Sequence, residues 1–306
     1  MRLGQSRGMK QVSNLRGIGF MLAGAGTFVF NDSLMKIALV DLPPYQVLVM
    51  RGLSGTICAI ALLAFMGDLK KLPQALNRWV FLRAILEVGA ILTYILALAN
   101  ASIGDVTAIF QITPLLVILG MIFIHRESAN LTRLALIALG FAGALFVAQP
   151  GAGTTSPFIL FAFCTAIFAA LRDLAGRRVT TAIPALAATL ITIILVMVGA
   201  AIANLGSEQW LAPSAYLIIL MAAAGFFMML GHMFIFLAYR NASAQSVAPF
   251  YYAFMIWAIV LGYLLFGDVP NALSMTGMLL ILASGLGIVY LERHLSKNHP
   301  QPFPEA

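Results

Sequence analysis

Ionisable side chains interrupt the hydrophobic stretches of this chain and recur at a fixed spacing of 141 residues. Asp32 falls on Asp173, and the base one helical turn later, Lys36, falls on Arg177. An acid and a base four residues apart share one face of a helix and can form an ion pair. Arg51, which follows in the next hydrophobic stretch, is another candidate partner for Asp32. This pattern predicts matched gating residues that pair when one end of a pathway closes, or two ion pairs that only anchor helix ends.

Six further polar or aromatic side chains within the hydrophobic stretches are candidates for contact with a solute: Glu87, Gln111, His232, Tyr251, Tyr252 and Trp257. Glu87 either neutralises Arg83 one turn earlier, or faces a cavity as a proton site or a counter-charge. His232 titrates near neutral pH, which suits proton coupling, although a histidine on an apolar helix also often bonds a neighbour. Aromatic rings offer flat, amphipathic surfaces to a partly apolar solute, whereas Trp257 equally suits an interfacial belt.

Two of these hydrophobic stretches each contain a proline, Pro114 and Pro249. Proline removes one bond of the helical ladder and frees a carbonyl oxygen. Such a break is tolerated at membrane depth where neighbouring groups or water bond the freed carbonyl. Gln111 and Tyr252 match at the 141-residue spacing beside these prolines, so we expect both stretches to line a central cavity.

Sequence motifs for catalysis and nucleotide binding are absent. There is no phosphate-binding Gly-x-x-x-x-Gly-Lys sequence, no His-Glu-x-x-His and no Gly-x-Ser-x-Gly. Cys58 and Cys164 both lie in apolar runs without metal-ligand spacing, so we expect no metal and no cofactor. An enzyme embedded in the membrane stays an alternative, with only dispersed candidates: Asp32, Glu87, Asp173 and His232.

The composition places the chain in a membrane. Hydrophobic residues make up 61% of 306 positions, charged residues 9%, and the mean hydropathy is +0.97. Soluble domains carry about 25% charged residues. A bilayer core about 30 Å thick needs roughly 20 apolar residues per helix. Ten stretches satisfy this length, at 17–38, 44–66, 79–99, 104–125, 131–148, 156–176, 183–203, 212–238, 243–266 and 271–291.

Lys and Arg gather in alternate connections between these stretches. The loops near residues 41, 102, 152, 207 and 269 contain neither residue. Cytoplasmic loops are the ones enriched in Lys and Arg, so both termini are predicted to be cytoplasmic in a multi-pass protein of the bacterial inner membrane. The placement of the basic residues also explains the net charge of +7 without a nucleic-acid partner.

The 141-residue spacing predicts an internal duplication of five helices. An odd number of helices reverses the second copy in the membrane, which gives an inverted repeat suited to alternating access. We therefore expect an all-α integral membrane fold of ten helices. Its expected parts are a basic cytoplasmic tail (1–16), a first repeat (17–148), a second repeat (156–291) and a cytoplasmic C-terminal tail (292–306).

Several local sequences resemble the EamA-like branch of the drug/metabolite transporter superfamily over about residues 17–291. They are Ala238-Tyr-Arg-Asn-Ala-Ser243, Val247-Ala-Pro-Phe-Tyr-Tyr252, Trp257, Gly267-Asp-Val-Pro270, Asn31-Asp32 with Lys36, Arg51, and Pro114-Leu115. The resemblance implies ten helices in inverted repeats with cytoplasmic termini. Position 268 is Asp where that branch more often has Glu, and Glu127 stands at the matching place in the first repeat.

Together these patterns predict a secondary active transporter of a small metabolite that works by alternating access. The expected solute is amino-acid-like, zwitterionic or partly aromatic. A transporter for a cofactor-like solute, such as riboflavin or S-adenosylmethionine, is the second possibility. The predicted partners are the solute and membrane lipid, with protons as a candidate coupling ion. The oligomeric state and the direction of transport are left open.

Overall fold

A computed structural model describes residues 2–124, 131–149, 156–180, 183–205, 209–242 and 244–298. The side chains of residues 2–14 and of a few others near helix ends are outside this description. Within these ranges the chain forms only helices and the turns between them. The elements are α1 (Arg2–Ala38), α2 (Pro44–Met66), η1 (Leu69–Ala75), α3 (Arg78–Asn100), α4 (Ile103–Phe110), α5 (Thr113–Ile124), α6 (Leu131–Ala148), η2 (Pro157–Ile159), α7 (Leu160–Gly176), α8 (Ala185–Asn204), α9 (Ala215–Asn241), α10 (Ala244–Val247), η3 (Ala248–Tyr252), α11 (Ala253–Phe266) and α12 (Ala272–Asn298).

Ten of the described segments are long and apolar enough to cross a membrane, as the sequence predicted. Their bounds differ from the predicted ones by only a few residues at most ends. The first begins at Leu15 within the longer helix α1, so α1 continues into the basic tail. Likewise, α12 runs past the tenth span to Asn298. The predicted loop centres near 152 and 207 lie outside the described residues.

The two predicted spans with prolines are both interrupted helices. The fourth span consists of α4 and α5, which are separated at Gln111 and Ile112. Its freed carbonyl is satisfied locally, because Thr113 Oγ1 donates to Phe110 O at 2.6 Å. The ninth span consists of the 3₁₀ turn η3 and the helix α11, and it follows the short helix α10. The α4–α5 junction at residues 111–112 matches the η3–α11 junction at residues 252–253, and a proline lies within a few residues of each junction.

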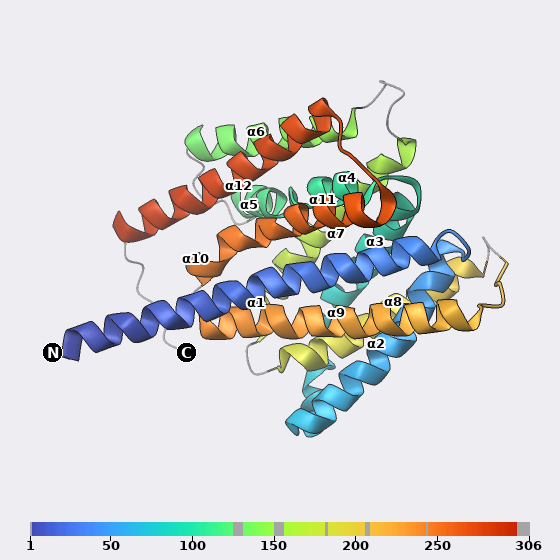
Figure 1. Ribbon diagram of the computed structural model, residues 1–306. Helices are drawn as coiled ribbons and strands as arrows, with labels where there is room; N and C mark the ends of the chain where they lie inside the picture. The colour runs from blue at the N-terminus through green and yellow to red at the C-terminus, as the bar shows by residue number, and fades with distance from the viewer. Residues whose placement is uncertain are drawn as a thin grey trace.

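The contacts between the repeats follow an inverted two-fold pattern (Figure 1). Helix α1 lies along α9, and its counterpart α7 lies along α3, the counterpart of α9. Two counterpart pairs, α2 with α8 and α6 with α12, also pack against one another. The last turn of α1 reaches Ala101 after α3, whereas Arg178 after α7 lies over the Trp79 ring at the start of α3. Therefore α1 and α7 run in opposite directions, and the five-helix repeats are inverted.

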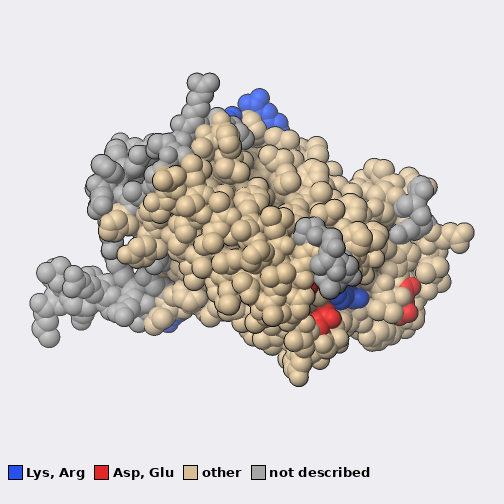
Figure 2. Space-filling model, turned by 90° about the horizontal axis from the view of Figure 1, so that it is seen from above, with Lys and Arg blue, Asp and Glu red and all other residues tan. Residues whose placement is uncertain are grey.

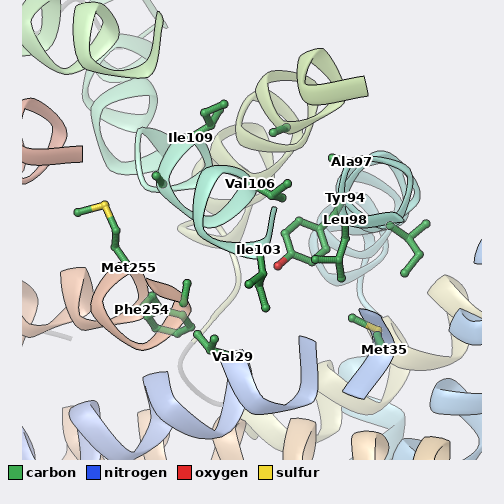
Figure 3. Packing of buried hydrophobic residues seen from close by; sticks show 14 of the residues in the cluster. Val29, Met35, Tyr94, Ala97, Leu98, Ile103, Val106, Ile109, Phe254 and Met255 are labelled. Carbon is green, nitrogen blue, oxygen red and sulfur yellow. The ribbon is translucent and has the colours of Figure 1, made fainter. Parts of the chain in front are cut away.

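The largest apolar core lies where the two repeats meet. Figure 3 shows side chains from α1, α3, α4 and α11 converging on one another, with the Tyr94 hydroxyl directed toward Ile103. The outer surface is also apolar. One face of the molecule is almost free of charged residues, which gather near its margins (Figure 2). Many large hydrophobic side chains, such as Phe65 and Ile219, are exposed on the molecular surface, where lipid can contact them.

Candidate functional site

The polar interior contains two clusters of side chains. The Asp32 cluster consists of Asn31, Asp32, Arg51, Tyr94 and Thr107, from α1, α2, α3 and α4. The Glu87 cluster consists of Arg83, Glu87, Arg172, Asp173 and Thr192, from α3, α7 and α8. Helix α3 contributes to both clusters, with Tyr94 in the first and Arg83 and Glu87 in the second. One end of the bundle contains Lys36 and is called the Lys36 end. The opposite end contains Arg177 and is called the Arg177 end.

Asp32 is held by neutral hydrogen-bond donors. Tyr94 Oη donates to Asp32 Oδ2 and Asn31 Nδ2 donates to Asp32 Oδ1, both at 2.8 Å. The expected ion pair with Lys36 is not formed, since the Lys36 ammonium group reaches other residues. Sequence spacing put the two side chains on one face of α1, but packing against α3 turns Asp32 toward Tyr94.

Arg51 is buried in α2, and its side chain has no hydrogen bond or ion pair with any residue that the structure describes. Its side chain is 6% exposed, and its Nε lacks a hydrogen bond. The charges of Asp32 and Glu87 both act on the guanidinium group. Neither acid, however, forms an ion pair with it in the described part of the chain. The expected contact between Asp32 and Arg51 is therefore a longer-range electrostatic interaction.

The Glu87 cluster, by contrast, is joined by direct contacts. Arg172 Nη1 donates to Glu87 Oε2 at 2.6 Å, and Arg172 Nε donates to Asp173 Oδ1 at 2.8 Å. Arg83 Nη1 donates to Thr192 Oγ1 at 3.1 Å. Glu87 is thus held by an arginine of the other repeat rather than by Arg83 alone. His232 acts on Glu87 electrostatically and packs edge-on against Phe28, with ring centroids 4.8 Å apart.

Arg172 was not among the residues singled out from the sequence. The repeat spacing pairs it with Asn31, and the two side chains make the same local bond. Each donates to Oδ1 of the aspartate that follows it, at 2.8 Å. The matched dipeptides Asn31-Asp32 and Arg172-Asp173 were a signal that could have found it. The difference in residue type obscured this match.

At the Lys36 end, one basic side chain joins three elements. Lys36 Nζ donates to Ala101 O at 2.5 Å, lies 3.8 Å from Asp268 Oδ2, and sits over the Phe266 ring. Lys36 thus links α1 to the end of α3 and to the end of α11 in the other repeat. The matched Arg177 is exposed, and its side chain makes no hydrogen bond or ion pair with any described residue. Asp173 therefore pairs with Arg172, not with Arg177 as expected.

The two helix breaks touch each other across the repeats. Gln111 is fully buried, and its Nε2 donates to Tyr251 O at 3.1 Å while its Oε1 lacks a partner. The charges of Asp173, Arg172 and Glu87 act on the Tyr251 hydroxyl. Gln111 at the end of α4 therefore contacts Tyr251 of η3. The Tyr251 hydroxyl lies within electrostatic range of the Glu87 cluster.

Tyr252 and Trp257 lie apart from these clusters. The Tyr252 ring packs against Gly285 of α12. Trp257 is partly exposed, lies against Gly26, and donates to Leu22 O at 3.1 Å, so it ties α11 to α1. No group of three metal-ligating side chains is found among the described residues.

The comparisons with known proteins agree with this architecture. The sequence profile of the EamA-like transporter family matches residues 15–149 and again residues 156–290. The chain is 23% identical to an S-adenosylmethionine uptake transporter of Rickettsia conorii, over 93% of this chain and 96% of that protein. It is 25% identical to a riboflavin transporter of Vibrio cholerae, over 93% and 96% of the two chains. It is 24% identical to a pseudopaline exporter of Pseudomonas aeruginosa, over 90% and 98%.

A solved crystal structure shares the fold, with a TM-score of 0.64 at 17% identity and coverage of 94% of this chain and 99% of the other. The family profile covers the chain twice, with its matches separated by the same 141 residues that relate the two inverted repeats. The chain belongs to the EamA-like transporter family.

Proposed function

We propose that this protein is a secondary transporter that moves a small amino-acid-like, zwitterionic or partly aromatic solute by alternating access. Its membrane is the inner membrane of a bacterium, with both termini in the cytoplasm and the Lys36 end facing outward. The main supporting observation is the inverted pair of repeats that meets around two polar clusters in an otherwise apolar bundle. Buried ionisable groups inside membrane helices mark solute and ion pathways.

The gates of this transporter are matched basic residues near the two ends. Lys36 bridges to Asp268 of the other repeat, which closes the Lys36 end. By the repeat spacing, the equivalent partner of Arg177 is Glu127, which lies outside the described residues. We propose that Arg177 and Glu127 pair when the opposite end closes. Asp32, Asp173 and Arg51 were expected from the sequence to be gating residues. In this proposal they belong to the interior clusters and not to the gates.

The charge balance of the interior favours a zwitterion. The two clusters contain three bases and three acids: Arg51, Arg83, Arg172, Asp32, Glu87 and Asp173. A solute with one positive and one negative group preserves this balance. A singly charged solute would instead leave an uncompensated charge in a region of low dielectric constant, at a cost of several kcal/mol. Aromatic rings at Phe28, Tyr94 and Tyr251 supply apolar surface beside the charges.

The relatives are named for three different solutes, so a substrate panel is needed. Purified protein in proteoliposomes loaded with one unlabelled solute should accumulate the same labelled solute by counterflow. The panel contains the twenty amino acids, S-adenosylmethionine and riboflavin. We expect counterflow with at least one amino-acid-like member, and none with Asp32→Asn. Counterflow with riboflavin alone would contradict the zwitterionic class.

Two further proposals concern energy and chemistry. If protons drive uptake, a protonophore should abolish accumulation against a gradient but leave counterflow intact. The protein is proposed to have no enzymatic activity, because its interior acids are engaged in bonds to Tyr94 and Arg172 rather than to a nucleophile. Chemically unchanged solute recovered from the vesicles would support this assignment, whereas a converted product would contradict it.

A further inference from the structure

Arg51 stands out among the interior charges because its surroundings fix its position without neutralising it by contact. Ser54 Oγ on the next turn of α2 donates to Met221 O of α9 at 2.9 Å. The Arg51 carbonyl lies against Gly225, where an added Cβ would come within 2.8 Å of it. The Ser54–Met221 bond and the close approach at Gly225 hold this turn of α2 against α9. The Arg51 backbone therefore has a fixed position in the interior of the bundle.

The two clusters differ in how their bases are used. Arg172 donates hydrogen bonds to Glu87 and Asp173, and Arg83 donates one to Thr192. Arg51 has no such contact, although a guanidinium group presents five N–H donors in a fork that matches a carboxylate. Buried charges are ordinarily paired or hydrogen-bonded. Among the described residues Arg51 is thus the interior arginine whose side chain makes no hydrogen bond or ion pair to a neighbour, which makes it the first candidate for an anion receptor.

Other polar atoms lie in the same cluster. Asn31 Oδ1 is buried and has no hydrogen-bond partner among the described residues, and Thr107 Oγ1 lies beside the Tyr94 hydroxyl. Asn31 Oδ1 can only accept a hydrogen bond, as can the carboxylate of Asp32. The cluster thus contains donors that suit an anion and acceptors that suit an ammonium group. Both kinds of group are needed to bind a zwitterion.

We infer that Arg51 is the residue that recognises a carboxylate of the transported solute, while Asp32 and Asn31 receive its ammonium group. The inference rests on the proposed transport function and assigns the chemical group that selects the solute. Arg51 is then a specificity residue, not a gate. An α-amino acid fits because its two charges are separated by a single carbon atom, whereas an amine, an amide or an uncharged flavin leaves Arg51 unpaired.

A first experiment measures the charge of the site without a substrate. Thr107→Cys is introduced into full-length protein whose Cys58 and Cys164 are replaced by Ser. The reporter is treated with an anionic and a cationic methanethiosulfonate reagent, and the ratio of the two reaction rates is measured. We expect Arg51→Gln to lower the anion-to-cation ratio at least tenfold, and Arg51→Lys to retain it. The matched control Arg83→Gln should leave the ratio within twofold.

A second experiment uses defined ligands. Each of the twenty amino acids and its α-amide is tested for its shift of the melting temperature of the purified protein. At least one free acid should raise the melting temperature, its amide should not, and Arg51→Gln should abolish the shift.

These measurements separate the inference from the transport function. An unchanged reagent ratio in Arg51→Gln, or no reaction with either reagent, overturns the inference, because the charge is then neutralised or sealed from solutes. An amide that binds as well as its acid overturns it too. If no acid shifts the melting temperature, the reagent ratio alone decides. The expected ratio together with failed counterflow for every panel member would refute transport while leaving the anion receptor intact.

Discussion

Single residues in this interior gain their roles from the contacts they make. Arg172 is the clearest case, since one guanidinium group holds two carboxylates on different helices. Its contacts with Glu87 and Asp173 measure 2.6 and 2.8 Å. Loss of one partner from a fully buried ion pair costs about 3–5 kcal/mol. The cost is smaller here, because the Asp173 side chain is 43% exposed and solvent screens its charge. Arg172 therefore stabilises the packing of α3 against α7, besides any part in transport.

Replacement of Arg172 by Gln should destabilise the folded protein by up to about 3 kcal/mol, because Glu87 and Asp173 then lie close together without a base between them. Thermal unfolding in detergent measures the effect. Arg177→Gln is the matched control, since Arg177 is an exposed base on the same segment without a described partner. Equal melting temperatures for the two variants would show that the Arg172 contacts contribute no stability.

Residue partners were the part of the site that the sequence could not predict. Spacing placed Asp32 near Lys36 and Asp173 near Arg177, because it reports only which side chains share a helix face. The partners actually used, Tyr94 and Arg172, depend on how α3 packs against α1 and α7. The repeat spacing did match Asp32 with Asp173, and the residues before them, Asn31 and Arg172, make equivalent bonds.

At the scale of helices, the sequence predicted the structure well, because a bilayer fixes how long and how apolar each spanning helix must be. Apolar length predicted all ten spans, and the two prolines predicted both interrupted helices. Close helix contacts follow small residues. Helices α6 and α12 cross where a Cβ on Gly143 would lie 2.6 Å from Gly277 O. The short turn η1 between α2 and α3 was not predicted, since its sequence has no apolar length to signal it.

Gly143→Val should force α6 and α12 apart, and overpacking of this kind costs about 1–3 kcal/mol. A lower melting temperature in detergent is the expected result. Gly19→Val is the control, because an added Cβ at Gly19 meets nothing within 4 Å. Both variants exchange the same residue types within a helix. If Gly19→Val is destabilised as much, the effect comes from helix propensity and not from the crossing.

At the scale of the whole molecule, the two five-helix repeats run in opposite directions. Each end of the bundle therefore contains the residues of one repeat that match those of the other repeat at the opposite end. The distribution of Lys and Arg predicts that the Lys36 end faces outward. Single cysteines at Asp41 and Gln74, on a background without Cys58 and Cys164, test this orientation. An impermeant maleimide applied to intact cells should label position 41 and not position 74. The reverse pattern would invert the topology.

The central claim is that matched basic residues close the two ends in turn. A cysteine at Thr107, in the interior between the ends, reports access when labelled from each side of oriented vesicles. Lys36→Gln removes the contact with Asp268 and should increase labelling from the Lys36 end, whereas Arg177→Gln should increase it from the Arg177 end. A coupling of about 1.4 kcal/mol corresponds to a tenfold change in the ratio of the two rates. Shifts in opposite directions are the result predicted by alternating access through inverted repeats. Shifts in the same direction, or no shift in either variant, would contradict it.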